Sequence, residues 1–372
     1  MMQQGIFYDL ANFFIVLIFA LFIIRKNKLQ PFVSILIVAH AVLPYVLNDV
    51  LFPWQYLGDQ GRYFNAVLAI RDGDWLGGGE QGTVLYASRF LAFIPLPFVL
   101  TIKSLGFFNT FLFLWLFHFL YRRGFLSLEN ALFYLIYPSF ALYTGLSLRD
   151  TLILFFMVMS LYFVMKGHRL FSLLLTVPLI YIKGQNFLIM GPFIFLYGIL
   201  GGQGGISRKQ LFITIGVTIS LAVVTAPLWF NELNHFRRAM FKEDGGTFYE
   251  ALLLQSTDQV FSQGIFAAFY MLFKPFPWDA SNAFQLIQSF ENIILLWFLA
   301  KVTIDAYRKD KYHTLFWLFF LLTAMTVYGL VVFNFGTAAR YRYPLLIVYY
   351  FAIASNIRSR QATDAPLIGQ TR

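Results

Sequence analysis

The sequence predicts an all-α protein, a polytopic bundle of transmembrane helices, on three observations. Of its 372 residues, 59% are hydrophobic and only 12% are charged. A soluble globular chain carries about 25% charged residues, roughly twice this share. The apolar residues also come in blocks of about 15 to 22, and a bilayer core takes about 20 apolar helical residues per crossing. Together these features predict a membrane protein.

The apolar blocks predict about eleven spans, within a range of roughly ten to thirteen. They are residues 6–24, 31–51, 107–121, 130–147, 151–166, 169–182, 186–201, 210–229, 287–303, 313–333 and 341–357. Segment 85–104 is apolar too, but Pro95 and Pro97 interrupt it, and proline breaks helices. We therefore expect a re-entrant or interfacial pair of half-helices there, on the outer face.

The basic residues predict the orientation, because Lys and Arg prefer the cytoplasmic side of a membrane. Eleven spans place the following basic connections inside: 25–28, 121–124, 166–169, 207–209 and 305–311. We expect one transmembrane domain over 1–360, with the outer loops 52–106 and 231–286 forming the face that carries the site. Residues 361–372 are expected to be a disordered cytoplasmic tail.

Several classes of chemistry are excluded or disfavoured by the sequence. The net charge of +10 is spread over short loops, so it does not predict nucleic-acid binding, and there are no cysteines. The histidines show no metal-ligand spacing. There is no P-loop, no dinucleotide fingerprint and no cytoplasmic loop long enough for a nucleotide-binding domain. Any chemistry is therefore expected at the outer face, without a soluble nucleotide.

The first outer loop, "YLGDQGRYFN", carries Asp59 and Arg62, with Tyr63 beside them. Gly and Asp are turn formers, so one interpretation is a plain turn with a local ion pair. The other is that Asp59 serves a site on the outer face. The glycine-rich stretch that follows is expected to be mobile, with solvated acids at Asp72, Asp74 and Glu80.

Two further outer junctions carry ionisable residues. Arg149 and Asp150 stand between two apolar runs, where they form either an interfacial ion pair at a helix start or part of a polar cavity. Lys183 lies near Gln185 at a predicted helix end. A lysine there commonly extends its side chain to the interface. A functional role is therefore less strongly indicated for Lys183 than for Arg149 and Asp150.

The stretch "FKPFPWDASNAFQLIQSFENIILLW" combines Lys274, two prolines and Trp278, and is typical of an interfacial clamp. Glu291 falls inside the start of the next span. It is either a site residue or a buried acid paired with a basic neighbour.

The late outer stretch "NFGTAARYRYP" places Arg340 and Arg342 just before the last span. Gly336 and Pro344 predict a bent loop that lets both guanidinium groups reach one ligand. Simple anchoring among lipid phosphates is the alternative. Because arginine binds phosphate in a bidentate manner, we favour a phosphate-binding pair.

This pattern of an early outer acid, a second outer acid and a late "R.R.P" resembles the GT-C superfamily of integral-membrane glycosyltransferases. It also resembles membrane proteins of bacterial exopolysaccharide and O-antigen clusters. The resemblance implies a GT-C-like fold and makes Asp59 the base that activates the acceptor hydroxyl. Asp150 would organise the site or, with Asp59, hold a divalent cation such as magnesium or manganese. Arg340 and Arg342 would hold the donor phosphate.

The expected function is glycosyl transfer from a polyprenyl-phosphate- or diphosphate-linked sugar at the outer face of the bacterial inner membrane. Lys183 and Arg149 are further phosphate-binding candidates. The acceptor is a glycan, a lipid-linked glycan or a protein, and membrane lipids are the other partners. One alternative is a Wzy-like polysaccharide polymerase, in which arginines act without an essential carboxylate. The other is a lipid-linked oligosaccharide flippase, which is expected to show internal repeats.

Overall fold

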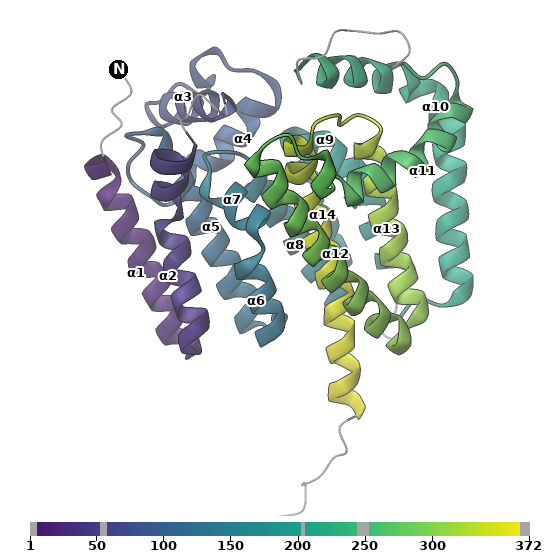
Figure 1. Cartoon of the computed structure of the whole chain (residues 1–372). Helices are drawn as coiled ribbons and strands as arrows, with labels where there is room; N and C mark the ends of the chain where they lie inside the picture. The colour runs from purple at the N-terminus through teal and green to yellow at the C-terminus, as the bar shows by residue number, and fades with distance from the viewer. Residues whose placement is uncertain (1–5, 53–57, 202–204, 244–252, 365–372) are drawn as a thin grey trace, which may run out of the picture. The chain divides into compact units, whose positions relative to one another are not determined.

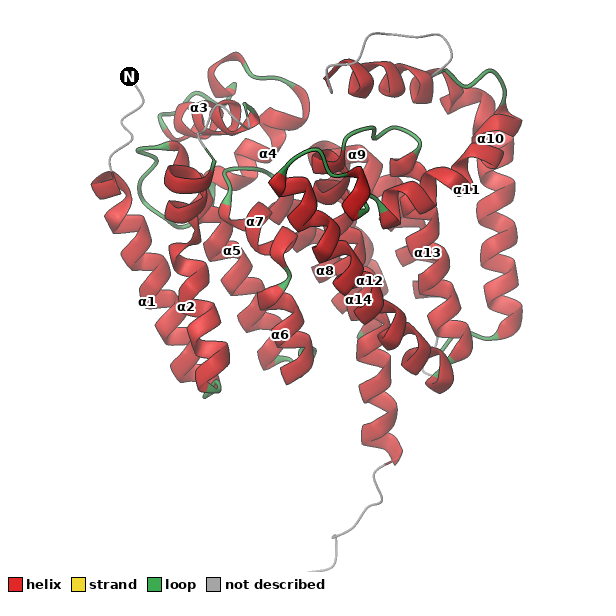
Figure 2. Cartoon of the chain, viewed as in Figure 1, coloured by secondary structure: helices red, strands yellow, loops and turns green. Residues whose placement is uncertain are grey.

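The computed structural model describes residues 6–52, 58–201, 205–243 and 253–364, and the regular elements in these ranges are all helices (Figures 1 and 2). The α-helices are α1 (Leu10–Asn27), α2 (Pro31–Tyr45), α3 (Asp59–Arg71), α4 (Gly82–Ala92), α5 (Ile102–Arg122), α6 (Leu128–Ile136), α7 (Pro138–Gly145), α8 (Asp150–Met165), α9 (Arg169–Leu200), α10 (Arg208–Glu243), α11 (Thr257–Phe273), α12 (Ala283–Lys309), α13 (Lys311–Gly329) and α14 (Phe335–Asp364). Short 3₁₀ or π turns cover 6–9, 46–51, 77–79 and 277–279. The all-α prediction is confirmed for these ranges.

The chain packs as two compact units, Met1–Gly191 and Pro192–Arg372, called here the N-terminal and C-terminal units. The division concerns packing alone, and a single membrane domain over 1–360 stays a prediction. Helix α14 continues to Asp364, so it includes the first residues of the predicted tail. The rest of that tail, 365–372, lies outside the described residues.

Seven of the described helices are long and apolar enough to cross a membrane. They are α1, α2 with the turn after it (Pro31–Asn48), α5, α9, α10 to Lys242, α12 and α13. Helices α7 and α8 meet at a bend of 119°, and this pair becomes an eighth crossing if it counts as one broken span. The membrane class is supported, and the count of eleven stays a prediction.

The predicted span 130–147 is wrong as a single helix. Two short helices, α6 and α7, occupy it instead, and they separate at Tyr137. A proline ring disfavours helical dihedrals at the residue before it. Tyr137 precedes Pro138 and has φ −58° and ψ 110°, outside the helical region. The chain then leaves α7 and forms a short irregular segment, 146–149, before α8 begins. We call this segment the α7–α8 connection.

The predicted break in segment 85–104 is confirmed. Helix α4 ends at Ala92, and the chain stays irregular until Thr101 caps α5. The Arg71 guanidinium supports the irregular backbone by donating to the carbonyls of Ala92, Ile94 and Leu96 at 3.1, 2.6 and 2.5 Å. Such bonding satisfies carbonyls that a broken helix would otherwise leave without donors.

Two other segments that were predicted to be outer loops are helical instead. Helix α10 continues to Glu243 and α11 fills 257–273, so 231–286 is mostly not a loop. Helix α14 begins at Phe335 and contains Pro344, so the predicted bent loop at 334–344 is wrong. Positions two apart on a helix point about 200° apart, so Arg340 and Arg342 diverge. The predicted boundary between 169–182 and 186–201 survives as a break in α9 at Lys183, with φ −161° and ψ 88°.

Small residues bring α11 and α13 of the C-terminal unit close together. A Cβ added to Gly329 on α13 would collide with the Ala267 carbonyl oxygen on α11, and one on Gly264 would lie 2.9 Å from Thr326. Helices in membranes pack through small residues because van der Waals contact replaces the hydrophobic effect there.

Candidate functional site

Two helix starts that carry predicted acids lie close together in the N-terminal unit. Asp59 is the first residue of α3, and the next residue, Gln60, is fully buried. The Ser147 backbone N–H donates to Gln60 Oε1 at 2.9 Å. Ser147 belongs to the α7–α8 connection and precedes Asp150 by three positions. A side chain from the Asp59 helix therefore holds the segment that leads to Asp150.

The α7–α8 connection is fixed by two further side chains. Asn109, near the middle of the apolar helix α5, donates from Nδ2 to the carbonyls of Leu146 and Leu148, both at 2.6 Å. The Ser147 hydroxyl donates to the Ile102 carbonyl. Just before the connection, Asn48 donates from Nδ2 to the Gly145 carbonyl at 3.2 Å. The bent backbone is thus bonded on several sides.

Arg149 and Asp150 lie at the start of α8. Asp150 is 2% exposed and stands in the first turn, where the helix dipole favours a negative charge. No side chain in the described residues caps this helix start. Arg149 is partly buried, and its Nη1 has no hydrogen-bond partner among the described residues. A carboxylate and a guanidinium therefore stand on consecutive residues at the bend of a broken apolar helix pair.

Four other polar atoms around this bend also lack a partner within the described ranges. They are Asn48 Oδ1, Gln60 Nε2, Asn109 Oδ1 and Thr151 Oγ1, and each is buried. In each of the three side-chain amides, the other polar atom makes the bonds described above. These bonds decide which end of the amide is oxygen and which is nitrogen. We call these four atoms and Arg149 Nη1 the polar cradle.

The glycine-rich stretch after α3 is more ordered than predicted. Glu80 was expected to be solvated, but Arg62 donates to both of its carboxylate oxygens, at 3.1 and 2.7 Å. These bonds lower the pKa of Glu80 and raise that of Arg62. Asp74 was also expected to be solvated, yet its carboxylate accepts the N–H groups of Leu76 and Gly78, both at 2.9 Å. Turn chemistry explains this, because an Asp side chain bonds the backbone just ahead of it.

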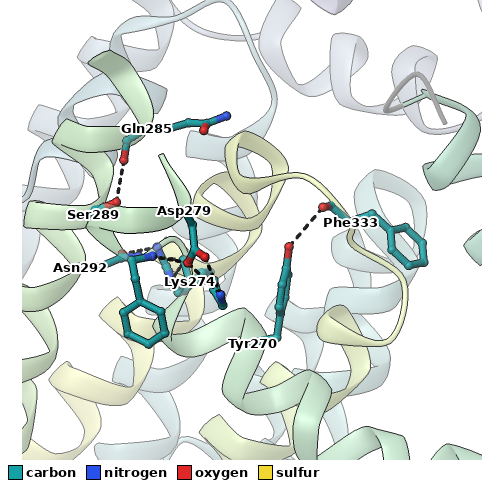
Figure 3. A network of polar contacts seen from close by, with 9 residues as sticks. Tyr270, Lys274, Asp279, Gln285, Ser289, Asn292 and Phe333 are labelled. Carbon is teal, nitrogen blue, oxygen red and sulfur yellow. Dashed lines mark hydrogen bonds and ion pairs between the residues drawn. The ribbon is translucent and has the colours of Figure 1, made fainter. Parts of the chain in front are cut away.

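The predicted interfacial clamp forms a separate network in the C-terminal unit (Figure 3). Lys274 Nζ donates to both Asp279 oxygens at 2.8 Å, which lowers the pKa of Asp279. The Phe276 N–H donates to the same carboxylate. Asn292 on α12 donates to the Lys274 carbonyl at 2.9 Å, and Trp278 stacks on Phe276 with ring centroids 4.8 Å apart.

Arg342 bonds two residues of this network and is 2% exposed. Its Nη1 donates to the carbonyls of Met271, Leu272 and Lys274 at 3.0 to 3.1 Å, and its Nη2 donates to Asn292 Oδ1. A cation at the last carbonyls of α11 is favourable. Much of the guanidinium is thus occupied by the protein itself, while its predicted phosphate role stays a prediction.

The other predicted residues are spread over the two units. Tyr63 is buried on α3, Lys183 is buried at the break of α9, and Gln185 is partly buried two residues later. In the C-terminal unit, Glu291 on α12 and Arg340 on α14 are both partly buried. Within the N-terminal unit, the Gln60–Ser147 bond brings the helix start of Asp59 close to the helix start of Arg149 and Asp150.

Sequence reasoning missed Gln60 and Asn109, which organise the bend. An amide inside the block "GFFNTFLFLWLF" was a usable signal, because a polar residue in an apolar helix needs a partner. It also missed Asp9, which is fully buried and accepts from the Ser104 hydroxyl at 2.6 Å and from the Thr101 hydroxyl. That acid ties the start of α1 to the start of α5.

In the described part of the chain, no three residues among His, Cys, Asp and Glu form a group that could hold a metal ion. A shallow open hollow at the start of α10 is lined by Arg208, Lys209, Phe212 and Ile213, none of them a predicted site residue. No protein-family model, no curated protein and no solved structure matches the sequence.

Proposed function

We propose that this chain is a membrane glycosyltransferase that takes a sugar from a polyprenyl phosphate or diphosphate. The observation that supports it best is the Gln60–Ser147 hydrogen bond, which ties the helix start carrying Asp59 to the segment carrying Arg149 and Asp150. An acid, a cation and a second acid at the bend of apolar helices suit a substrate with a lipid tail. The proposal keeps the GT-C-like, multi-span topology with the site at the outer face of a bacterial inner membrane.

The reaction would use these groups as follows. The Asp59 carboxylate takes the proton of the acceptor hydroxyl, whose oxygen then bonds to the anomeric carbon of the donor sugar. The bond from that carbon to the phosphate oxygen breaks, and its electron pair leaves with the lipid phosphate. Arg149 stabilises the charge that develops on this phosphate, and Asp150 holds Arg149 and the acceptor in register. The acceptor is a glycan, a lipid-linked glycan or a protein, and the product belongs to a cell-surface polysaccharide or glycoconjugate.

The test is transfer from a polyprenyl-phosphate-linked sugar, measured for the wild type and for Asp59→Asn at matched protein. The amide keeps the size and hydrogen bonding of the side chain but cannot take the proton. Transfer is expected to fall by about 10²–10⁴-fold with little change in protein level. Asp72→Asn is the matched control, since Asp72 is exposed at the other end of α3. Near-normal transfer by Asp59→Asn would sink the base assignment and favour the arginine-driven polymerase.

A further inference from the structure

The polar cradle is unusual because it combines several unmet hydrogen-bonding groups at one bend. Gln60 and Asn109 are fully buried and Thr151 is 1% exposed, yet each keeps one polar atom without a partner in the described residues. A buried polar atom without a partner is costly, more so at low dielectric. A membrane protein that keeps several of them at one bend is expected to use them.

The bonds already made place these residues around one segment. Gln60 and Asn109 both bond the α7–α8 connection, through Ser147 on one side and through Leu146 and Leu148 on the other. Thr151 follows the connection directly, in the first turn of α8. The atoms left over are therefore grouped around the same short segment.

The mixture of donors and acceptors indicates the chemistry of the ligand. Gln60 Nε2 and Arg149 Nη1 can only donate, Asn48 Oδ1 and Asn109 Oδ1 can only accept, and a threonine hydroxyl does both. A phosphate would satisfy the donors but offer no N–H or O–H to the amide oxygens. A cation would satisfy the acceptors and be repelled by Arg149. A group that donates and accepts at the same atom satisfies both sets, as a water molecule or a sugar hydroxyl does.

We infer that the polar cradle binds the hydroxyl groups of a sugar ring. The inference rests on the proposed function, because it makes this ring the one carried by the polyprenyl phosphate. The cradle atoms are closed to solvent in this structure, so binding requires a local opening of the packing around them. Thr151 then acts as a specificity-determining residue, and Gln60 and Asn109 both position the connection and contact the sugar.

Thr151→Val gives the sharpest test, because valine has the same shape and removes only a hydroxyl for which the described residues supply no hydrogen-bond partner. The probes are polyprenyl phosphates carrying glucose, galactose, mannose or N-acetylglucosamine, together with bare polyprenyl phosphate. Wild type is expected to bind at least one sugar lipid more tightly than bare polyprenyl phosphate. The variant is expected to lose about three- to tenfold of that preference, to keep its affinity for bare polyprenyl phosphate, and to melt at or above the wild-type temperature. Thr151→Ser restores the preference.

Thr176→Val is the matched control, since Thr176 is also 1% exposed but its hydroxyl already donates to the Leu173 carbonyl at 2.7 Å. It is expected to melt lower and to keep the sugar preference. The inference fails if wild type shows no preference, if Thr151→Val keeps it, or if Thr151→Val melts clearly below wild type. Normal transfer with an unchanged preference in Thr151→Val would remove the inference and leave the proposed function. If wild type shows no transfer but Thr151→Val loses the preference for the sugar lipid, the proposed function fails and the inference remains.

Discussion

The two units of this protein each bend an apolar chain around polar residues, and they complete the bend differently. In the C-terminal unit, Arg342 and Asn292 bond the carbonyls where α11 ends, and Lys274 is paired with Asp279. In the N-terminal unit, Gln60 and Asn109 bond the α7–α8 connection but retain unmet groups. A bend whose hydrogen bonds are mostly made stabilises the fold. A bend that keeps unmet groups at a cost is where a ligand is expected.

Arg342→Met tests the C-terminal bend and should have the largest effect on stability. Three carbonyls and Asn292 Oδ1 lose their donor in a buried place, so we expect a loss of about 3–5 kcal/mol. The stability of Arg342→Lys should lie between those of wild type and Arg342→Met, because a single ammonium group cannot reproduce the planar fork of donors. The measurement is the amount of monodisperse protein left after heating in detergent. Arg340→Met is the control and should lose less. A stable Arg342→Lys with poor sugar transfer would restore the phosphate-binding assignment.

Two asparagines, one at each bend, allow the roles of the two bends to be compared directly. Asn109→Leu removes the donor to two carbonyls of the connection, and Asn292→Leu removes the partner of Arg342 and Lys274. Each is expected to lose about 1–3 kcal/mol. Transfer measured on the folded fraction should fall strongly for Asn109→Leu only, because that residue holds the segment of Asp150. Equal transfer by both folded variants would contradict the contrast between the bends.

The surface pair of Arg62 and Glu80 should have the smallest effect. Its side chains are 53% and 22% exposed, so we expect less than about 1 kcal/mol after solvent screening. The pKa of Glu80 lies below its ordinary value of 4.5 in the folded protein. Its contribution is therefore present above about pH 4.5 and is lost as the pH falls through the lowered pKa. Thermal unfolding of Glu80→Gln should differ from wild type at pH 7, and the difference should shrink as the pH falls below 4.5. A difference that does not shrink with falling pH would show that the pair acts by packing instead.

Local chemistry explains which predictions succeeded. Helix α4 ends three residues before Pro95, and α6 and α7 separate at Tyr137, just before Pro138. Proline lacks the N–H that a continuing helix needs, and its ring disfavours helical dihedrals at the preceding residue. The same rule misled the reading of 334–344, where Pro344 lies inside α14. Its neighbours in the described chain bury this stretch of helix, and packing of that kind outweighs the cost of one proline. The prediction of one helix over 130–147 was wrong because the continuous hydropathy was given more weight than Pro138, and the helices break at Tyr137.

By itself, the sequence determined the all-helical class and the long apolar helices suited to a membrane. It also located the break after α4, the break near Lys183, and the pair Arg149 and Asp150 at the start of α8. Hydropathy and backbone sterics are local, so they can be read along the chain. Only the tertiary structure decided that Gln60 meets Ser147, that Arg62 prefers Glu80, and that Arg342 bonds the end of α11. These contacts join residues 18 to 87 positions apart, and they depend on how each helix is rotated against its neighbours. Rotation is set by packing over the whole unit, which no local pattern contains.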